Sequence, residues 1–215
     1  MLTLRYSLGL TALLAMPLVA AGDPSGPAPM PPGYDMGFVT NGDFESSLAG
    51  WTEYVTGFAS YTSYTSFASN KAGLLVAEEY LAEEPSGEPG EPPVLIEMVG
   101  YATFDQEVTL PYGSGEFSFV YWLDGGSPVY AAASLDDEVL AILDTSTGEW
   151  VTETRVIPSS LAGSTVHLQF DAIGPIGGGG PTRLWLDYVS ITPEPATLAL
   201  LAIGGLGVLI RRRRV

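Results

Sequence analysis

Cysteine is absent from the 215 residues of this chain. The absence excludes zinc–thiolate sites and cysteine nucleophiles. It also excludes disulfides, although a domain of this length can bury enough apolar surface to fold without them. The fold must therefore come from packing alone.

Positive charge is scarce. Lys71, Arg155 and Arg183 are the only cationic residues between Asp23 and Ile191, whereas the chain has 25 acidic residues and a net charge of −17. Such a surface repels nucleic acid and anionic polysaccharide. It suits a divalent cation or a neutral glycan, and solubility alone explains most of these carboxylates.

Patterns for catalysis and for soluble helices are also lacking. Gly174–Pro181 has no Lys and no helix after it, so a phosphate-binding loop is a poor interpretation. The single histidine, His167, has Ser164 and Asp171 near it in sequence, but a triad requires proximity in space. A glycosidase pair cannot be chosen among so many acids. We therefore expect a non-catalytic protein.

The N-terminus has the features of a signal peptide, which we assign to residues 1–21. Arg5 supplies the positive charge, Leu8–Val19 is apolar, and Val19–Ala21 offers small residues for cleavage. Residues 22–37 are rich in proline and predict an extended linker that buries little.

The C-terminus, residues 193–215, predicts a short membrane segment. Residues 196–210 carry no charge, and Arg211, Arg212, Arg213 and Arg214 follow them. As a single transmembrane helix this run would span about 22 Å, less than the roughly 30 Å of a hydrocarbon core. Arginines mark the cytoplasmic end, so the rest of the protein lies outside. The alternatives are a plain anchor and a cleaved sorting signal.

The motif Pro193, Glu194 and Pro195, the short apolar run and the terminal arginines together resemble the PEP-CTERM sorting signal of Gram-negative, exopolysaccharide-producing bacteria. The stretch Thr192–Leu198 fits that pattern throughout. The resemblance implies an exosortase-type sorting enzyme as a partner. It further implies a precursor anchored in the inner membrane, followed by localisation to the cell envelope, cell surface or extracellular matrix.

The middle of the chain, residues 38–192, predicts an all-β domain. Phe117, Phe119, Tyr121 and Leu123 alternate with the residues between them, which is the period of a strand. Short strands separated by turns favour a β-sandwich. We expect strands within Trp51–Phe67, Ala72–Ala77, Val94–Leu110, Phe117–Leu123, Tyr130–Leu143, Val151–Ile157, Val166–Phe170 and Leu184–Ile191, and a solvated loop over Glu78–Pro93.

Two short motifs refine this expectation. The opening Asn41–Glu45, followed by Trp51, and the closing Leu186–Ser190 resemble the galactose-binding-like jelly rolls found in many carbohydrate-binding modules. That resemblance implies a jelly-roll sandwich whose first and last strands meet. It also implies a structural Ca²⁺, for which Asp43, Glu45 and Asp187 would supply carboxylates. Tyr188 departs from the pattern, because an acid is common there. Alternatively, Asn41 and Asp43 only close a turn.

A glycan ligand would require exposed aromatic rings. Trp122 is out of phase with Phe119, so it would point to the opposite face of its strand, and Tyr54, Tyr61 and Tyr64 are further candidates. Core packing is the alternative for each of them. We therefore expect an exported surface or matrix protein with a polysaccharide as a candidate partner; the alternatives are a glycan-active hydrolase and a purely structural matrix component.

Overall fold

The computed structural model describes residues 23–57, 60–67, 70–84, 94–113, 115–125, 130–175 and 180–193. Side chains are described for all of these except 80–84 and 94–97. The predicted signal peptide, Glu194, Pro195, the apolar run 196–210 and the terminal arginines lie outside these ranges. Within them, no helix is both long and apolar enough to cross a membrane.

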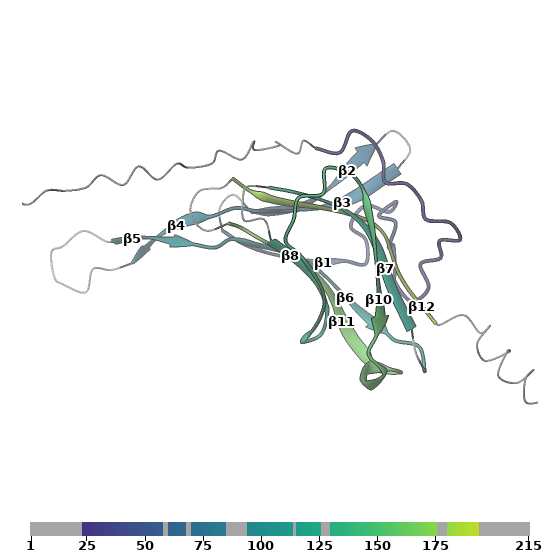
Figure 1. The fold of residues 1–215 in the computed structure, drawn as a ribbon. Coiled ribbons are helices and arrows are strands. Elements are labelled where there is room, and N and C mark those ends of the chain that lie inside the picture. The colour runs from purple at the N-terminus through teal and green to yellow at the C-terminus, as the bar shows by residue number, and fades with distance from the viewer. Residues whose placement is uncertain are drawn as a thin grey trace, which may run out of the picture.

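The described residues form a sandwich of two five-stranded sheets in which all paired strands are antiparallel (Figure 1). Sheet A has the order β10-β7-β12-β3-β2, and sheet B has the order β1-β6-β11-β8-β9. The strands are β1 Thr52–Thr56, β2 Tyr61–Phe67, β3 Asn70–Ala77, β4 Tyr80–Glu84, β5 Val94–Met98, β6 Tyr101–Thr109, β7 Gly115–Asp124, β8 Tyr130–Leu135, β9 Glu138–Leu143, β10 Val151–Ile157, β11 Thr165–Ile173 and β12 Thr182–Pro193, with a short 3₁₀ helix η1 Ser159–Leu161.

The core lies between the two sheets and follows the alternation read from the sequence. Phe117, Phe119 and Leu123 of β7 are fully buried there, and Phe170 of β11 packs against Phe119 with ring centroids 5.1 Å apart. The period of two places every second side chain of a strand on the same face. The prediction of an all-β sandwich is confirmed.

The acidic segment Glu78–Pro93 was expected to be a loop, but part of it forms a strand. Tyr80–Glu84 forms β4, which pairs with β5 as a two-stranded ribbon that extends from the sandwich (Figure 1). The ladder places Leu81 opposite Glu97 and Ala82 opposite Ile96. Backbone pairing with a strand rich in β-branched and apolar residues overrides the repulsion among the acids.

The proline-rich N-terminal segment buries more than expected. It lies against the outer face of sheet A, where Ala28 is only 5% exposed. The Trp150 indole Nε1 donates a hydrogen bond to the Gly26 carbonyl at 3.0 Å, and the Tyr34 hydroxyl donates to the Val189 carbonyl at 3.2 Å. Proline restricts the backbone of this segment, and the side chains of Trp150 and Tyr188 pack against it.

The Asn41–Glu45 motif closes a tight loop before β1 and contacts the last strand, where the Val189 N–H of β12 donates to the Gly42 carbonyl at 2.8 Å. The first and last strands themselves do not pair, because β1 lies in sheet B and β12 in sheet A. The Asn41 amide Nδ2 donates to the carbonyls of Ser47 at 2.9 Å and Ala49 at 3.0 Å, and the Trp51 Nε1 donates to the Asn41 carbonyl at 3.2 Å. A Cβ on Gly42 would lie 2.0 Å from the Val189 carbonyl oxygen, so only glycine fits there. The side-chain-to-backbone role expected for Asn41 is therefore present.

Candidate functional site

The face of sheet B that points away from the core carries the most site-like arrangement. Its pairing register aligns Tyr54, Thr103, Asp171, Ala132 and Ile142 in one row across the five strands. The next row along the strands holds Thr56, Tyr101, Ile173 and Tyr130. The row on the other side holds Thr52, Asp105, Gln169 and Ser134.

Three exposed tyrosines lie in two adjacent rows of this face, with Thr103 and Asp171 in the row of Tyr54, and Ile173 between Tyr101 and Tyr130. Tyr54 is 63% exposed, Tyr101 42% and Tyr130 38%, whereas Thr103 and Ser134 are buried. An exposed ring on a sheet offers an apolar surface of the kind that packs against the C–H face of a sugar. Polar groups beside it would accept or donate hydrogen bonds to hydroxyls.

Asp171 supplies a fixed carboxylate at the centre of the tyrosines. The Thr103 hydroxyl donates a 2.6 Å hydrogen bond to Asp171 Oδ1. Burial raises the pKa of the Asp171 carboxyl, with a further contribution from the nearby Asp105 carboxylate, while the Thr103 hydrogen bond lowers it. The Thr103 hydrogen bond restrains the orientation of this carboxylate.

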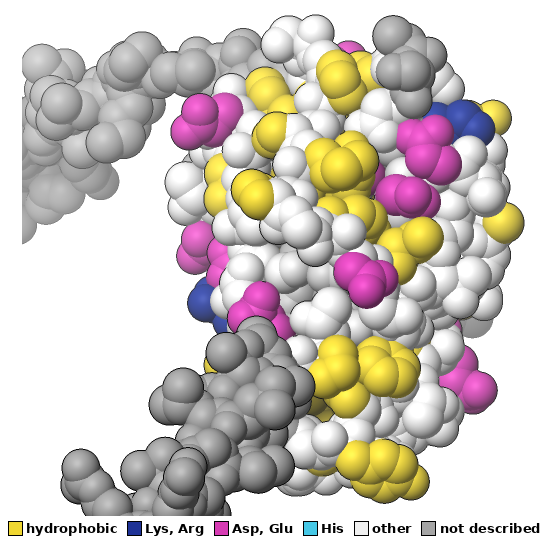
Figure 2. Space-filling view, turned by 90° about the vertical axis from the view of Figure 1, so that its right-hand side faces the viewer, with side chains coloured by type: hydrophobic (Ala, Val, Ile, Leu, Met, Phe, Trp, Pro, Cys, Tyr) yellow, Lys and Arg dark blue, Asp and Glu magenta, His cyan; other side chains and the backbone are white. Residues whose placement is uncertain are grey.

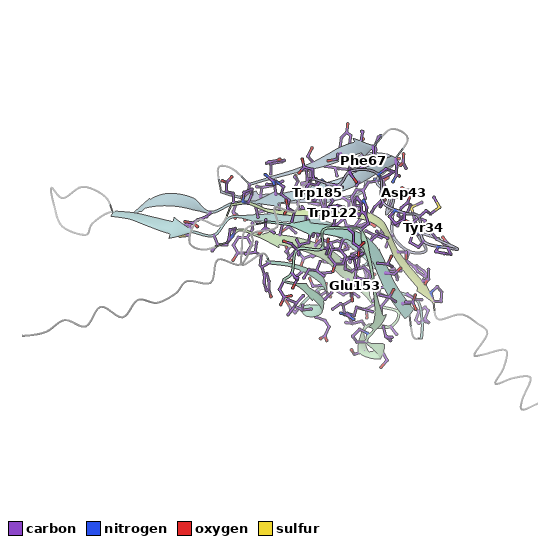
Figure 3. The ribbon with its side chains drawn as sticks, turned by 45° about the horizontal axis from the view of Figure 1, so that its top comes forward. Tyr34, Asp43, Phe67, Trp122, Glu153 and Trp185 are labelled. Atoms are coloured by element: carbon purple, nitrogen blue, oxygen red, sulfur yellow. The ribbon has the colours of Figure 1, made fainter. Side chains whose placement is uncertain are left out.

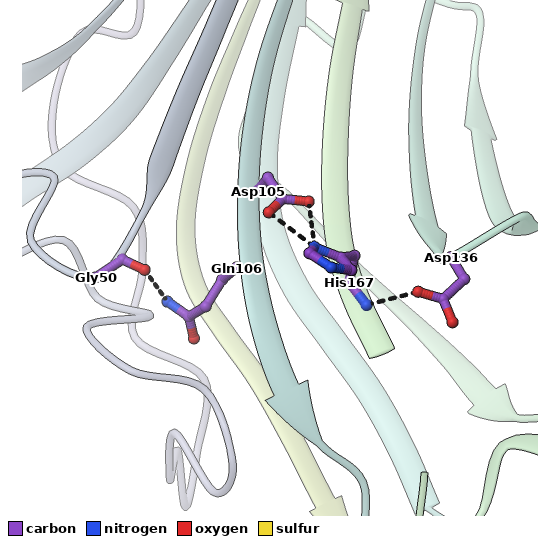
Figure 4. A network of polar contacts seen from close by, with 5 residues as sticks. All are labelled: Gly50, Asp105, Gln106, Asp136 and His167. Carbon is purple, nitrogen blue, oxygen red and sulfur yellow. Dashed lines mark hydrogen bonds and ion pairs between the residues drawn. The ribbon is translucent and has the colours of Figure 1, made fainter. Parts of the chain in front are cut away.

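His167 lies farther along the same face and pairs with Asp105 (Figure 4). Its Nδ1 lies 3.0 Å from Asp105 Oδ1, and this hydrogen bond, together with the carboxylate charge, raises the pKa of the imidazole. The backbone N–H of His167 donates to Asp136 Oδ1 at 2.7 Å. Asp105 therefore partners His167, and neither Ser164 nor Asp171 is bonded to it. No hydroxyl group in the described ranges is hydrogen-bonded to the ring, so these residues form no triad.

A hollow of about 210 Å³ opens on the outer face of the other sheet, sheet A. Tyr61, Phe67 and Trp185 line it together with Arg183, and Asp23 and Pro24 of the N-terminal segment complete its wall. Figure 3 shows Phe67, Trp122 and Trp185 over this sheet. On the side of the molecule turned toward the viewer in Figure 2, hydrophobic side chains gather in patches, acidic side chains lie around them, and few cations appear.

Trp122 points to the face opposite Phe119, as its phase in the strand predicted. It is nevertheless only 8% exposed, because the ring of Trp150 packs edge-on against it at 6.1 Å. A covered ring cannot stack on a ligand, so core-like packing is the correct interpretation of Trp122.

The tyrosines named from the sequence do not share one site. Tyr54 lies on sheet B, Tyr61 lines the hollow over sheet A, and the Tyr64 ring lies 5.5 Å from the Lys71 ammonium. Tyr101 and Tyr130 were missed. Only the pairing register of β1, β6, β11 and β8 brings them beside Tyr54, and register depends on partners far apart in the sequence.

The predicted calcium residues lie near one another. Asp187 is fully buried, and its carboxylate accepts hydrogen bonds from Asn70 Nδ2 at 2.9 Å and from the Tyr188 N–H at 2.8 Å. Burial raises the pKa of Asp187 to about 7, and the charges of Asp43 and Glu45 add to the increase.

These carboxylates do not form a ready coordination sphere. Asp43, Glu45 and Asn70 line a cavity of about 410 Å³ beside Pro27 and Ala28. Across the described part of the chain, however, no three acidic or histidine side chains are grouped as metal ligands. The structure thus contains a buried carboxylate whose charge a cation would neutralise, but not a complete set of ligands. The calcium site stays a prediction.

The comparisons with known proteins give one result for the tail and another for the domain. Residues 192–214 match the PEP-CTERM protein-sorting motif, and the chain carries this motif at its C-terminus. The motif implies export and sorting to the cell surface by an exosortase. No curated protein matches the chain.

Among solved structures, the sandwich is similar to the carbohydrate-binding module TmCBM61 in complex with β-1,4-galactotriose. The match has a TM-score of 0.50 and 15% identity, and covers 74% of this chain and all of that one. The CBM22-1 xylan-binding domain from Paenibacillus barcinonensis matches with a TM-score of 0.42 and 15% identity, over 70% of this chain and 90% of its own. The K3 adhesin domain of Lys-gingipain from Porphyromonas gingivalis matches at 0.44 and 17%, over 72% and 99%. The likeness to TmCBM61 shows the fold.

Proposed function

We propose that this exported protein binds a neutral glycan across the outer face of sheet B and has no catalytic activity of its own. The observation that carries the proposal is the register that surrounds Thr103 and Asp171 with Tyr54, Tyr101 and Tyr130. Exposed rings beside fixed polar groups would hold a polysaccharide chain by stacking on its sugar rings and by hydrogen bonding to its hydroxyls. The likeness of the sandwich to a galactotriose-binding module agrees with this proposal.

The charge of the same face selects the ligand class. Asp105, Glu107 and Asp171 lie on the outer side of sheet B, and His167, which is paired with Asp105, is the one histidine there. Carboxylates repel uronic acid and sulfate groups but accept hydrogen bonds from neutral hydroxyls. We therefore assign a neutral polysaccharide, such as an exopolysaccharide of the producing cell, as the ligand class.

The sorting motif of the tail indicates where in the cell this binding would take place. In this proposal the precursor is anchored in the inner membrane through residues 196–210, an exosortase then cuts at the Pro193–Pro195 motif, and the sandwich reaches the cell envelope or extracellular matrix. The jelly-roll domain would there hold exopolysaccharide to the surface. A purely structural matrix component is the alternative that sorting alone does not exclude.

Replacing the tyrosines tests the site. We expect Tyr54→Ala and Tyr101→Ala each to weaken binding to a neutral polysaccharide about tenfold, equivalent to about 1.4 kcal/mol, because each removes a stacking surface. Affinity gel electrophoresis with a panel of neutral polysaccharides would measure the change. Tyr112→Ala is the matched control, because Tyr112 is 93% exposed and lies outside this face.

Two outcomes would contradict the proposal. If Tyr54→Ala, Tyr112→Ala and the unchanged protein were retarded equally, the glycan-binding site would not lie on sheet B. Absence of retardation by every neutral polysaccharide would favour the structural component. Release of reducing sugar that depends on Asp171 would instead identify a hydrolase.

Calcium is tested separately, by thermal unfolding with and without EDTA. If Asp43, Glu45 and Asp187 bind Ca²⁺, calcium at about 100 times its dissociation constant adds about 2.7 kcal/mol to the free energy of unfolding. The expected result is a melting temperature that falls on adding EDTA and does not fall in Asp187→Asn. An unchanged melting temperature of the wild-type protein would remove the site.

A further inference from the structure

The last strand of the folded domain reaches into the sorting motif. β12 remains paired up to Pro193, which lies opposite Gly115 of β7, and Thr192 lies opposite Glu116. The sorting motif matches residues 192–214, so its first two residues are part of the sheet. β12 therefore ends beside the start of β7 (Figure 1).

The distance from this point to the membrane is short. Only Glu194 and Pro195 separate Pro193 from the apolar run that begins at Ala196. Even fully extended, each residue reaches at most about 3.6 Å. A tail embedded in the bilayer therefore keeps the end of β12 within roughly 10 Å of the point where the apolar run begins.

Exposed apolar side chains from several segments lie around this point, together with the exposed carboxylate of Glu116. We name it the exit end and define it by Phe38, Tyr112, Val156 and Pro193. Tyr112 is 93% exposed, Val156 68% and Phe38 42%. They come from three separate segments that meet beside the end of β12. The Phe38 N–H donates to the Ile191 carbonyl at 3.0 Å, Val156 is opposite Glu116, and Tyr112 closely precedes Gly115.

We propose that in the anchored precursor the exit end rests on the outer surface of the lipid bilayer that holds the tail. This inference rests on the anchoring in the proposed function, but not on glycan binding. Aromatic side chains favour the interfacial layer of a membrane. The acidic domain gains nothing from anionic headgroups, so the short tether and the apolar exit end together hold the contact. An enzyme embedded in the same bilayer would meet the sorting motif at this surface.

The cysteine-free chain allows a direct test with single-cysteine probes. Tyr112→Cys places a fluorophore at the exit end, and Thr145→Cys is the control at the opposite end of the sandwich. Thr145 closely follows the end of β9, and it lies near the end of β7 because the neighbouring Thr147 N–H donates to the Leu123 carbonyl. Both sites are exposed. The ten residues of β7 separate the two ends by about 30 Å. The full chain would be reconstituted into phosphatidylcholine vesicles that contain lipids with a headgroup-attached quencher.

We expect most of the fluorescence at position 112 to be lost and that at position 145 to be retained. Vesicle flotation of the same samples separates the two levels of the argument. If the chain does not float, the anchor is wrong and the inference falls with it. If it floats and the two probes are quenched equally, or the probe at 112 is not quenched, the anchor stands and the docked exit end is refuted.

Discussion

A precursor in which Pro193, Glu194 and Pro195 are replaced by three alanines is expected to keep its entire tail. The unchanged protein, taken from the surface of a cell with an exosortase, is expected to have lost residues 196–215 or most of them. The physical reason is that proline cannot continue a helix outward from the apolar run, so Glu194 and Pro195, which follow the last paired residue of β12, are expected to stay available to an enzyme. Intact-mass measurement of both proteins distinguishes the two forms.

A matched control is available within the chain. Glu91, Pro92 and Pro93 form an acidic, proline-containing triplet far from the tail in sequence, and their replacement by alanine is expected to leave processing unchanged. Recovery of peptides spanning Leu200–Ile210 from the wild-type surface protein would contradict cleavage and leave a plain anchor. A tail retained in both variants would show that the motif itself is not what the enzyme reads.

Much of the fold followed from local alternation. Phe117, Phe119 and Leu123 were enough to orient β7, because a strand with one face on a core must bury every second side chain. Strand was likewise expected within Tyr130–Leu143, and this range forms β8 and β9, which pair with each other. β4 was missed, since its acidic neighbours dominate the composition of that segment while its pairing with β5 is non-local.

The candidate site was less predictable for the same physical reason. Tyr54 was noticed from the sequence alone, but its neighbours Tyr101 and Tyr130 are 47 and 76 residues away in the chain. Only the ladder from β1 through β6 and β11 to β8 aligns them. The resemblance of the Asn41–Glu45 motif did predict that Asp43, Glu45 and Asp187 lie in one region. They do so because the motif contacts β12 close to Asp187, although the two are far apart in the sequence.

The opening motif also carries the largest stability prediction. Phe44 is fully buried, its ring stacks on Trp51 at 5.4 Å, and it lies 5.7 Å from Phe104. A Cβ on Gly73 would lie 2.5 Å from the Phe44 ring, so the glycine leaves the space that this ring fills. The backbone of Phe44 has φ of 54°, an unfavourable conformation that the packing of its side chain holds in place.

Phe44→Ala is therefore expected to lower the free energy of unfolding by about 3–5 kcal/mol, through the lost transfer of the ring and the cavity that remains. That is a large share of the roughly 5–15 kcal/mol of a typical domain, and it corresponds to a melting temperature lower by about 6–20 °C. Urea unfolding followed by tryptophan fluorescence would measure it. Phe38→Ala is the control, because Phe38 is 42% exposed and its removal should change stability by less than about 0.5 kcal/mol. If both variants unfolded at the same urea concentration, the Phe44 ring would be dispensable for the fold.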